Sequence, residues 1–597
     1  MLARNEKDSE GSPGIREPSE NETEEEFSNA QSTDLIYEGE EEPEIHLRTY
    51  FALAAMFLLN MVQVFCLMGP PAGLQYIESD LNNTVAGGWI PNSLSLVQAV
   101  LAPLISSASD TFQARKALLV GPSIISFIGA AIAPGSSSIY RVIAAQVLIG
   151  FGFATVPLAY CVPSEILPRK WRPRIEFAVT QAAMNVAAAL GACSAPLIIG
   201  GLTRGNAHTG WRSFYWIQMA LWGLTAIGLF IGYRPPKRHT GYDHLTLWQK
   251  IGRLDLPGFF LLTAGLTIFI AGLNLGGGIY SWSAAPVLAT LIVGIVCLIL
   301  FGIYEWKFTS TGILHHDLFR TEGSGGRTFA ICVALIFVEG ILLFAYSIFY
   351  PILTAEVFEQ DPLLMAAREQ PYWIAGGIGT MIYGYISTRY RTIRPPLSVG
   401  FLLLTAGVVG LATIEPKDDV SSMVFAGLAG LGFGSPLILL IAAVQLCTPH
   451  HLIATATAAT TCSRAIAAAI FTAIFNAAMN TRLDKYIPEY VGKAASEAGL
   501  PSNSVAAFVE DISSNNLAQL ANVSGVNSTI IAAGTAAFKQ AYADGVRVVF
   551  IIAAPFGLVA CIASWFLGDL RGVMDYTVQA PVEDLHSKRK NENPASV

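Results

Sequence analysis

Two ionisable side chains lie in the middle of long apolar runs of this 597-residue sequence. Glu339 falls in the run 328–350, and Arg464 falls in the run 452–479. Charge inside a bilayer is costly, so an ionisable residue within a membrane span is a candidate functional group by default. A carboxylate at this position can take up a proton or meet a cationic group of a substrate. The alternative is that Glu339 and Arg464 form a structural pair with each other.

Uncharged polar side chains recur in apolar runs of the same kind. Asn60 and Gln63 lie one turn apart, and Gln181 and Asn185 share a helix face by their i,i+4 spacing. Single amides and aromatic side chains complete the set: Gln98, Gln146, Gln445, Tyr346, Tyr350 and Trp373. Any one of them more often holds neighbouring helices together than contacts a ligand. Together they predict a cavity with polar points on apolar walls.

The cysteine and histidine residues lack the pattern of a metal or disulfide site. All eight cysteines fall in or beside apolar runs, so they form no disulfide framework. The adjacent pairs His315-His316 and His450-His451 lie in predicted loops, without the Cys/His spacing of a zinc site. The sequence contains no Walker A motif, which argues against ATP drive. We predict no catalytic residues, no metal and no cofactor.

The elements that would position these side chains are membrane-spanning helices. The chain is 53% hydrophobic and 13% charged, whereas soluble domains carry about 25% charged residues. In lipid, long apolar runs are helical because a helix satisfies its own backbone hydrogen bonds. The expected spans are 49–73, 89–108, 117–134, 139–161, 176–200, 212–233, 256–275, 284–304, 328–350, 370–388, 397–414, 421–446, 452–479 and 546–568. The sequence therefore predicts an all-α membrane protein with fourteen transmembrane helices.

Positive charge in the loops predicts the orientation of these spans. The loops after even-numbered spans carry most of it: Arg115, Lys116, Arg169, Lys170, Arg172, Arg174, Arg234, Lys237, Arg238, Lys250, Arg253, Arg389, Arg391 and Arg394. These loops and both termini are therefore expected in the cytoplasm. Glycosylation sequons begin at Asn82, Asn522 and Asn527, in loops expected outside, whereas Asn21 lies on the cytoplasmic tail and should stay unmodified.

The spans divide the chain into two halves with an insertion. Residues 1–46 are acidic, Ser-rich and low in aromatics, which predicts a disordered cytoplasmic tail and no signal peptide. The remaining parts are an N-terminal six-helix half (47–233), cytoplasmic loops with two inserted spans (234–327), a C-terminal six-helix half (328–568) and a second cytoplasmic tail (569–597). The outer loop 480–545 is long and amphipathic. It either caps an outer entrance or is a glycosylated decoration.

An acidic residue and a basic turn follow the second span. Asp110 lies at the predicted helix end, where it can pair with basic groups or with a helix N-terminus of the neighbouring half and act as a latch. The sequence here resembles the major facilitator signature G-x-L-A-D-R-x-G-R-R at Asp110 and Arg115. It departs from that signature at Ser106, Gln113 and Ala114.

The fifth span is rich in small residues around a proline. Gly191 and Gly200 allow neighbouring helices to approach, and Pro196 bends the span. The sequence from Gly191 to Gly201 is similar to the antiporter signature G-x-x-x-G-P-x-x-G-G of the same superfamily. It has Ala195 in place of the second Gly and the Gly pair one place late. This resemblance implies export.

The fourth span lacks one residue of the superfamily pattern R-x-x-Q-G-x-G. Position 146 holds Gln146 where that pattern puts its arginine, and Arg141 lies five residues outward. In the superfamily that arginine is linked to proton coupling. The absence of this arginine argues against the standard proton-coupling scheme of the superfamily in this protein.

Three further segments, with the span count and the long outer loop, resemble one fungal branch of the superfamily. They are Gly88 to Pro91, Pro163 to Arg169 and Gly210 to Ile217. The branch is that of trichothecene efflux pumps and siderophore transporters, and the resemblance covers roughly residues 45–575. It implies a major facilitator fold with two pseudo-symmetric halves that rock around a central cavity. It also implies the plasma membrane, or alternatively a vacuolar membrane.

The expected function is proton-coupled secondary active export of small amphipathic toxins, metabolites or drugs. The expected partners are a small-molecule substrate, protons and the lipid bilayer, with no nucleic acid, and the chain is expected to be a monomer. A ferric-siderophore:proton importer is the nearest alternative, because the resembled branch contains both kinds. A non-transporting sensor of the same fold is less expected because the C-terminal extension is short. An integral membrane enzyme would need clustered ligands that the sequence lacks.

Overall fold

The computed structural model describes residues 47–83, 86–166, 181–235, 246–276, 280–309, 312–313, 315–320, 325–449, 452–513, 523–571 and 574. Within these residues the chain is helical nearly throughout, as the apolar runs predict. Several predicted features lie outside the described residues: the tail 1–46 with Asn21, the basic residues 169–174 and 237–238, the pair His450-His451, Asn522 and nearly all of the tail 569–597.

The N-terminal half consists of long helices with short connections. Its described helices are α2 (Leu47–Ala72), α4 (Trp89–Phe112), α5 (Arg115–Ile132), α6 (Ile139–Phe153), α7 (Val156–Ile166), α8 (Gln181–Gly205) and α9 (Gly210–Gly232), joined by the short α3 (Leu74–Asp80) and η1 (Ala133–Gly135). The fourth predicted span is thus two helices, α6 and α7. One apolar core runs through this half and includes the buried residues Met56, Phe65 and Trp222.

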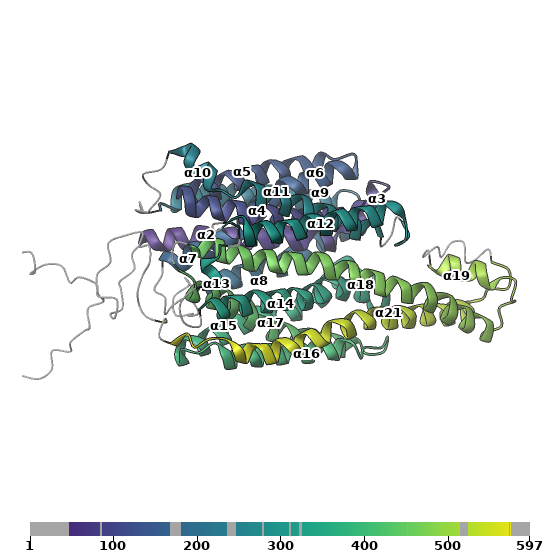
Figure 1. The fold of residues 1–597 in the computed structure, drawn as a ribbon. Helices are drawn as coiled ribbons and strands as arrows, with labels where there is room; N and C mark the ends of the chain where they lie inside the picture. The colour runs from purple at the N-terminus through teal and green to yellow at the C-terminus, as the bar shows by residue number, and fades with distance from the viewer. Residues whose placement is uncertain are drawn as a thin grey trace, which may run out of the picture.

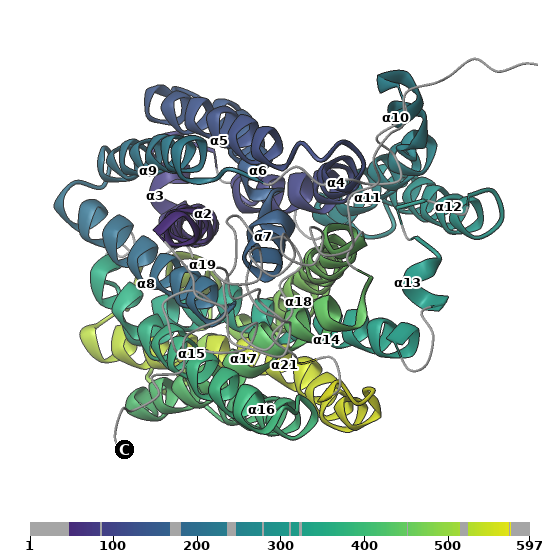
Figure 2. The ribbon, with the colours of Figure 1, turned by 90° about the vertical axis from the view of Figure 1, so that its left-hand side faces the viewer.

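The C-terminal half repeats this arrangement with longer helices. Its described helices are α14 (Gly325–Leu353), α15 (Pro362–Tyr390), α16 (Arg394–Leu411), α17 (Asp419–Cys447), α18 (Ile453–Glu497) and α21 (Ser528–Ala563), with the short η3 (Thr354–Phe358), α19 (Val505–Ser513) and η5 (Ser564–Phe566). A second apolar core runs through them. Figure 2, which looks along the helices, shows α2 to α9 on one side of the bundle and α14 to α21 on the other.

The two inserted spans form a helical pair beside the seam between the halves. They are α11 (Leu256–Gly276) and α12 (Ala285–Lys307), flanked by α10 (Leu247–Arg253) and α13 (Asp317–Arg320). Helix α11 packs against α4 of one half and α18 of the other. Leu262, Leu266 and Ile270 supply the apolar contacts, together with Ala99 and Ala465. Figure 2 shows the pair outside the ring formed by the two halves.

The structure accounts for the predicted spans with one difference in count. Among the described residues, 13 helices are long and apolar enough to cross a membrane. The predicted span 370–388 corresponds to α15, which is not among the 13 because Tyr, Gly and Gln residues make it less apolar. Helix α15 nevertheless packs within the bundle, against α17 and α8. Fourteen spans are therefore consistent with the structure.

The predicted outer loop 480–545 is largely helical. Helix α18 continues from the bundle to Glu497, and α21 begins at Ser528, well before its predicted span. Figure 1 shows the two helices side by side beyond the rest of the bundle, with α19 at their tip. Val491, Phe508 and Ile530 belong to a small separate apolar core there. This segment is a folded projection rather than a long connection.

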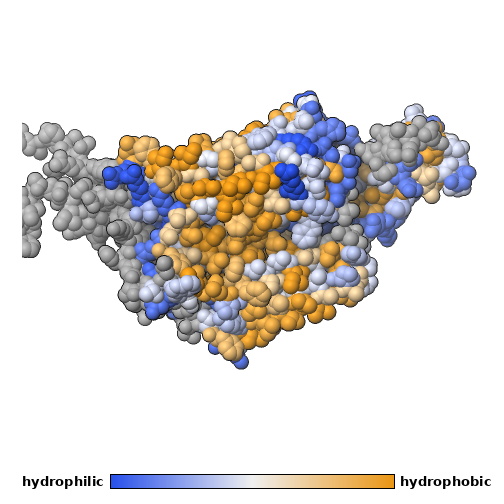
Figure 3. Space-filling view, turned by 90° about the horizontal axis from the view of Figure 1, so that it is seen from above, coloured by the Kyte–Doolittle hydropathy of each residue, from blue (hydrophilic) through white to orange (hydrophobic). Residues whose placement is uncertain are grey.

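The surface carries an apolar belt between two polar ends. Figure 3 shows this belt across one face, with hydrophilic residues gathered at both ends of the helices. Ile227, Ile292 and Ile299 are among the large apolar side chains exposed on it, each 56–59% exposed. A belt of this kind fits contact with lipid tails. The orientation predicted from the positive charges places the end of the bundle at which α2 begins in the cytoplasm and the end that carries α3 and α19 outside, and the two ends are named after that prediction.

Candidate functional site

A cavity lies between the two halves near the middle of the bundle. Its volume is about 100 Å³, and its lining comes from α2, α4, α6, α7 and α8 of one half and from α14, α15, α17 and α18 of the other. A second cavity of about 290 Å³ shares Leu67, Met68, Ser95, Phe344 and Ala465 with the first. It reaches the first turn of α4 and the last turns of α14. The two cavities together form a path from the centre toward the outer end.

The amides of α2 and α8 line this cavity and keep free polar atoms. Asn60 donates to the Met56 carbonyl at 3.0 Å. Gln63 donates from Nε2 to the Gly152 carbonyl at 2.9 Å, while its buried Oε1 has no hydrogen-bond partner among the described residues. Asn185 Oδ1 accepts from the Tyr160 hydroxyl at 3.1 Å, and its buried Nδ2 likewise has no partner among the described residues. Buried polar atoms favour a bonding partner, so a substrate or water entering the cavity finds bonding groups here.

The fourth span is interrupted beside Gln63. Helix α6 ends at Phe153 and α7 begins at Val156. The Gly152 carbonyl at this break accepts hydrogen bonds from Gln63 Nε2 and, at 2.7 Å, from the Thr155 hydroxyl. Irregular backbone at membrane depth is found where it lines a cavity or is buried in protein. The break therefore provides a backbone carbonyl that holds the amide of Gln63, a residue that lines the cavity.

Glu339 and Arg464 meet in the C-terminal half. Arg464 Nε lies 2.7 Å from Glu339 Oε2, so the pair joins α14 to α18. Gly340 allows this approach, because a Cβ there would lie 3.0 Å from the Arg464 carbonyl oxygen. The Glu339 side chain is fully buried, whereas that of Arg464 is 17% exposed and lines the cavity. The pair therefore presents its cation to the cavity and holds its anion behind the wall.

The predicted aromatic residues divide between the cavity and the packing behind it. Trp373 lines the cavity. Tyr346 is buried in a stack with Tyr350 and Tyr372, with ring centroids 4.9 and 3.9 Å away. Its hydroxyl donates to the Glu369 carbonyl at 3.3 Å. The stack supports the wall rather than facing a substrate.

The remaining candidate amides lie in different places. Gln98 lines the cavity. Gln146 is buried within the N-terminal half, where its Nε2 donates to the Tyr215 hydroxyl at 3.1 Å. Gln445 bridges the halves below the cavity, donating at 3.3 Å to the Tyr160 carbonyl. Gln181 begins α8, but its side chain lies outside the described part of the chain.

Asp110 joins the two halves at the cytoplasmic end. Its Oδ2 accepts from the backbone N–H of Thr455 at 3.1 Å and from the Thr455 hydroxyl at 2.9 Å. Thr455 lies in the first turn of α18, so the carboxylate caps the positive end of a helix in the other half. Arg115 holds the carboxylate from behind at 3.2 Å and also pairs with Glu165.

The small residues of α8 lie at two helix contacts. A Cβ on Gly191 would lie 2.4 Å from the Met61 carbonyl oxygen of α2, and a Cβ on Gly200 would lie 2.7 Å from the Pro362 carbonyl oxygen of α15. The second contact joins the two halves near the outer end. Pro196 lies inside α8, which continues through it as one helix.

Comparison with known proteins gives the family. The family model described as "Fungal trichothecene efflux pump (TRI12)" matches residues 29–593, nearly the whole sequence. The chain belongs to the fungal trichothecene efflux pump family. It is similar to the MFS-type transporter prx5 of Penicillium rubens, with 27% identity over 74% of this chain and 78% of that one.

Other relatives match a smaller share of their length. The efflux pump dotC of Dothistroma septosporum is 24% identical over 68% of this chain and 66% of its own. The MFS-type transporter ucsD of Acremonium sp is 27% identical over 65% of this chain, and the match spans 64% of that relative. The family model and these relatives are named as efflux pumps or MFS-type transporters, which agrees with the predicted class of membrane transporter.

Solved structures show the fold of this family member. A bacterial homologue of the lysosomal transporter Spinster, in an inward-facing and unoccupied conformation, has a TM-score of 0.51 at 14% identity, covering 87% of this chain and 98% of its own. The proton:xylose symporter XylE has a TM-score of 0.51 at 11% identity, over 88% and 98%. The predicted major facilitator fold of a multi-pass membrane protein is thereby confirmed.

Two polar residues of this efflux pump family member lie at its cavities and escaped the sequence prediction. Glu369 is 8% exposed and lines the outer cavity. It fell just before the predicted span 370–388, whereas α15 begins at Pro362. Tyr160 lines the central cavity and bonds to Asn185. Its position one residue before the end of the predicted span 139–161 was a signal that could have been used.

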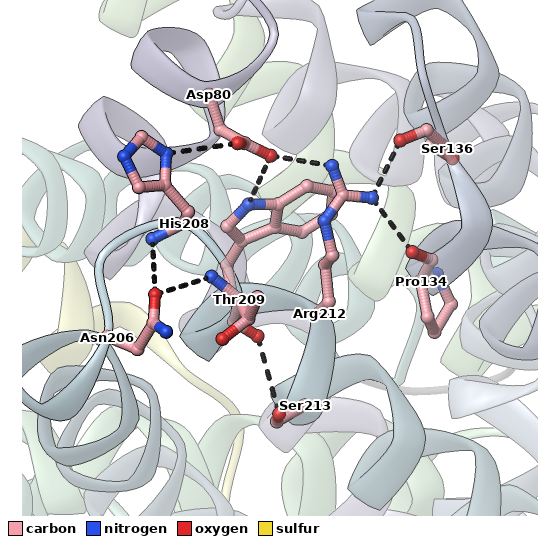
Figure 4. Close-up of polar contacts among 9 residues, drawn as sticks. Asp80, Pro134, Ser136, Asn206, His208, Thr209, Arg212 and Ser213 are labelled. Carbon is pink, nitrogen blue, oxygen red and sulfur yellow. Dashed lines mark hydrogen bonds and ion pairs between the residues drawn. The ribbon is translucent and has the colours of Figure 1, made fainter.

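The sequence at the start of α9 ties the outer ends of the N-terminal half together. Arg212 donates to Asp80 Oδ2 at 2.6 Å and to the carbonyls of Pro134 and Ser136 at 2.8 and 2.7 Å. The Trp211 indole donates to the same Asp80 oxygen at 3.2 Å. Figure 4 shows these contacts converging from α3, η1 and α9. Burial alone would raise the pKa of the Asp80 carboxyl, but the bond from Arg212 and the other donors lower it below its ordinary value. The Trp-Arg sequence is thus a clamp outside the cavity.

Two of the predicted glycosylation sites fall in the described residues. Asn527 is exposed, and its Oδ1 caps α21 by accepting from the Ile530 N–H at 2.9 Å. Its Nδ2, to which a glycan would be attached, makes no bond in that cap. Asn82 is exposed in a left-handed turn with φ of 49°. Use of either site stays a prediction.

Proposed function

We propose that this family member exports small amphipathic molecules in exchange for protons, by alternating access. The observation that carries the proposal is the cavity between the halves. Its apolar walls surround the Arg464 guanidinium and polar atoms of Gln63, Asn185 and Trp373 that have no hydrogen-bond partner in the described part of the chain. Apolar walls with a few fixed polar groups suit a molecule with an oily body and some polar oxygens. Relatives named as efflux pumps support the direction.

The proposed proton site is Glu339. In the ionised state its carboxylate neutralises Arg464, so the cavity wall carries no net charge from the pair. When a proton from the outer side neutralises Glu339, Arg464 loses its partner and the wall becomes cationic. A bound cationic molecule is then repelled by the unpaired Arg464 guanidinium and leaves through the outer cavity. This coupling does not use an arginine at position 146.

The closure of the cytoplasmic end supports the second half of the cycle. Asp110 on α4 and Gln445 on α17 hold the halves together below the cavity, while the outer cavity reaches the first turn of α4 and the last turns of α14. Opening toward the cytoplasm requires breaking the contact between Asp110 and the start of α18. Rocking about the α8–α15 and α4–α18 contacts would make these changes together.

The test uses the purified full-length protein in proteoliposomes, with an imposed pH gradient and a panel of amphipathic toxins and metabolites. Wild type should accumulate at least one solute against its gradient. Glu339→Gln should still exchange labelled solute for unlabelled solute but lose the pH-driven accumulation. Glu415→Gln, a carboxylate exposed at the outer end, is the matched control and should keep both. Accumulation driven by the pH gradient in Glu339→Gln would contradict proton coupling through this residue.

Growth assays decide the direction and the substrate class. A strain that overexpresses the protein should resist a toxin of the panel, and a deletion strain should be more sensitive to it. Loss of growth on siderophore-bound iron, with no change toward any toxin, would overturn export in favour of ferric-siderophore import. In that case the cation of Arg464 in the cavity wall would meet an anionic chelate.

A further inference from the structure

A groove on the outside of the N-terminal half lies between α2 and α9. Its volume is about 530 Å³, and apart from two arginines its lining is apolar. None of its lining residues lines the central or the outer cavity. Phe51 and Leu224 on its walls are 59% and 56% exposed, so the groove opens to the side on the apolar surface. It is therefore separate from the proposed transport path.

Small residues shape this groove. Ala54 on α2 is exposed in the lining, and Gly228 lies opposite on α9. A Cβ on Gly228 would have only Ala55 near it, at 3.9 Å, so there is open room beside this glycine. A turn later the helices approach, because a Cβ on Gly232 would lie 3.0 Å from the Phe51 carbonyl oxygen. A slot therefore runs along α2 and α9, and it is wide because Ala54 and Gly228 fill little of it.

The groove ends in a pair of arginines at the cytoplasmic end of the bundle. Arg48 lies in the first turn of α2, and Arg234 is the second residue after the end of α9. Both are exposed, and neither has an acidic partner among the described residues. Two exposed cations at the mouth of an apolar slot complement a molecule with an anionic head and a long apolar tail.

We infer that this groove binds one anionic glycerophospholipid of the cytoplasmic leaflet. The acyl chain lies along Ala54, Leu224 and Gly228, and the phosphate with its acidic headgroup meets Arg48 and Arg234. The cytoplasmic leaflet is where anionic lipids are concentrated, and basic pockets between transmembrane helices on that side bind such headgroups. Both arginines lie at the ends of membrane-spanning helices, which is the depth at which lipid headgroups are found.

The test measures lipid binding to the purified full-length protein by native mass spectrometry, with phosphatidylserine and phosphatidylcholine as probes. The wild-type protein should retain phosphatidylserine in preference to phosphatidylcholine. Arg48→Gln/Arg234→Gln should lose roughly tenfold or more in affinity for phosphatidylserine and approach the value for phosphatidylcholine. Ala54→Trp, which fills the slot from an exposed position, should weaken both lipids.

A matched control removes the same charge from the same end. Arg389→Gln/Arg391→Gln changes two exposed arginines at the end of α15, far from the groove in sequence, and should leave the preference unchanged. Equal retention of both lipids by wild type would overturn the inference, as would an equal loss in the control. Full competition by inorganic phosphate would show a plain anion site, and a dimer seated on this face would show a protein interface; each of these would also overturn it.

Discussion

Asp110 Oδ2 in α4 accepts hydrogen bonds from both the backbone N–H and the hydroxyl of Thr455 in α18, across the seam between the two halves. One carboxylate oxygen thereby caps a helix that belongs to the other half. The contact is possible only while the cytoplasmic ends of α4 and α18 lie together. The contact is therefore a marker of the closed cytoplasmic end, and its two residues can be changed to test whether it keeps that end closed.

Removal of this cap should open the cytoplasmic end more often. Asp110→Ala should cost about 0.5–2 kcal/mol at the seam, the usual range for a lost cap. Thr455→Ala keeps the backbone bond and should have a smaller effect. The readout is the maleimide labelling rate of Cys462, which is buried at the α4–α18 contact, in a variant without the other cysteines. Equal rates in wild type and Asp110→Ala would contradict the latch.

Breaking the Glu339–Arg464 pair from one side should destabilise the protein strongly. Arg464→Ala leaves a fully buried carboxylate without its cation, and such a loss costs about 3–5 kcal/mol. Glu339→Gln/Arg464→Met removes both charges and should recover most of that stability. The melting temperatures of wild type and of the purified variants in detergent give the order of their stabilities. A double variant as unstable as Arg464→Ala would show that the charges matter less than the shape of the site.

The contact at Gly200 should tolerate no side chain. A Cβ there would lie 2.7 Å from the Pro362 carbonyl oxygen, whereas a Cβ on the adjacent Gly201 would have only a Leu363 methyl at 3.9 Å. Gly200→Ala should therefore cost about 1–3 kcal/mol, the range for overpacking, and slow transport. Gly201→Ala is the matched control and should be neutral in melting temperature and in transport rate. A neutral Gly200→Ala would show that α8 and α15 need not approach closely.

The outer clamp should depend on pH in a defined direction. Because the pKa of Asp80 is lowered below its ordinary value of 3.8 in the folded protein, its bonds stabilise the fold above that pH and are lost as pH falls below it. Asp80→Asn should cost roughly 1.5–3 kcal/mol at pH 6, as for hydrogen bonds to charged groups. The difference in melting temperature from wild type should shrink at about pH 3. A difference that is constant with pH would contradict a role for the charge.

The sequence predicted the elements of this fold better than their contacts. Apolar runs locate most of the spans because lipid forces such runs into helices. They do not show which side of a span faces the centre, since a span surrounded by lipid and helices is apolar all round. Gln63 and Asn185 face the cavity, whereas Gln146 and Tyr346 turn into their own half.

Contacts between residues far apart in the chain could not be predicted from one sequence. The segment around Asp110 predicted a partner on the neighbouring half, but no spacing could name Thr455, which is 345 residues away. Glu339 and Arg464 stood out as charges in apolar runs, and only the structure gives the 2.7 Å between them. Glu369 was missed because it lies one residue before the predicted span 370–388, whereas the helix that carries it begins at Pro362.

The helix that carries Arg464 at the cavity also forms the projection at the outer end. Helix α18 has 45 residues, and at 1.5 Å per residue the distance from Arg464 to its last turn is about 50 Å. With α21 beside it and a small apolar core at the tip, it is a stiff lever arm. A 10° tilt of the C-terminal half would sweep that tip by about 9 Å. A dye or antibody fragment fixed near Phe508 would thus magnify rearrangements at the cavity that are too small to follow there.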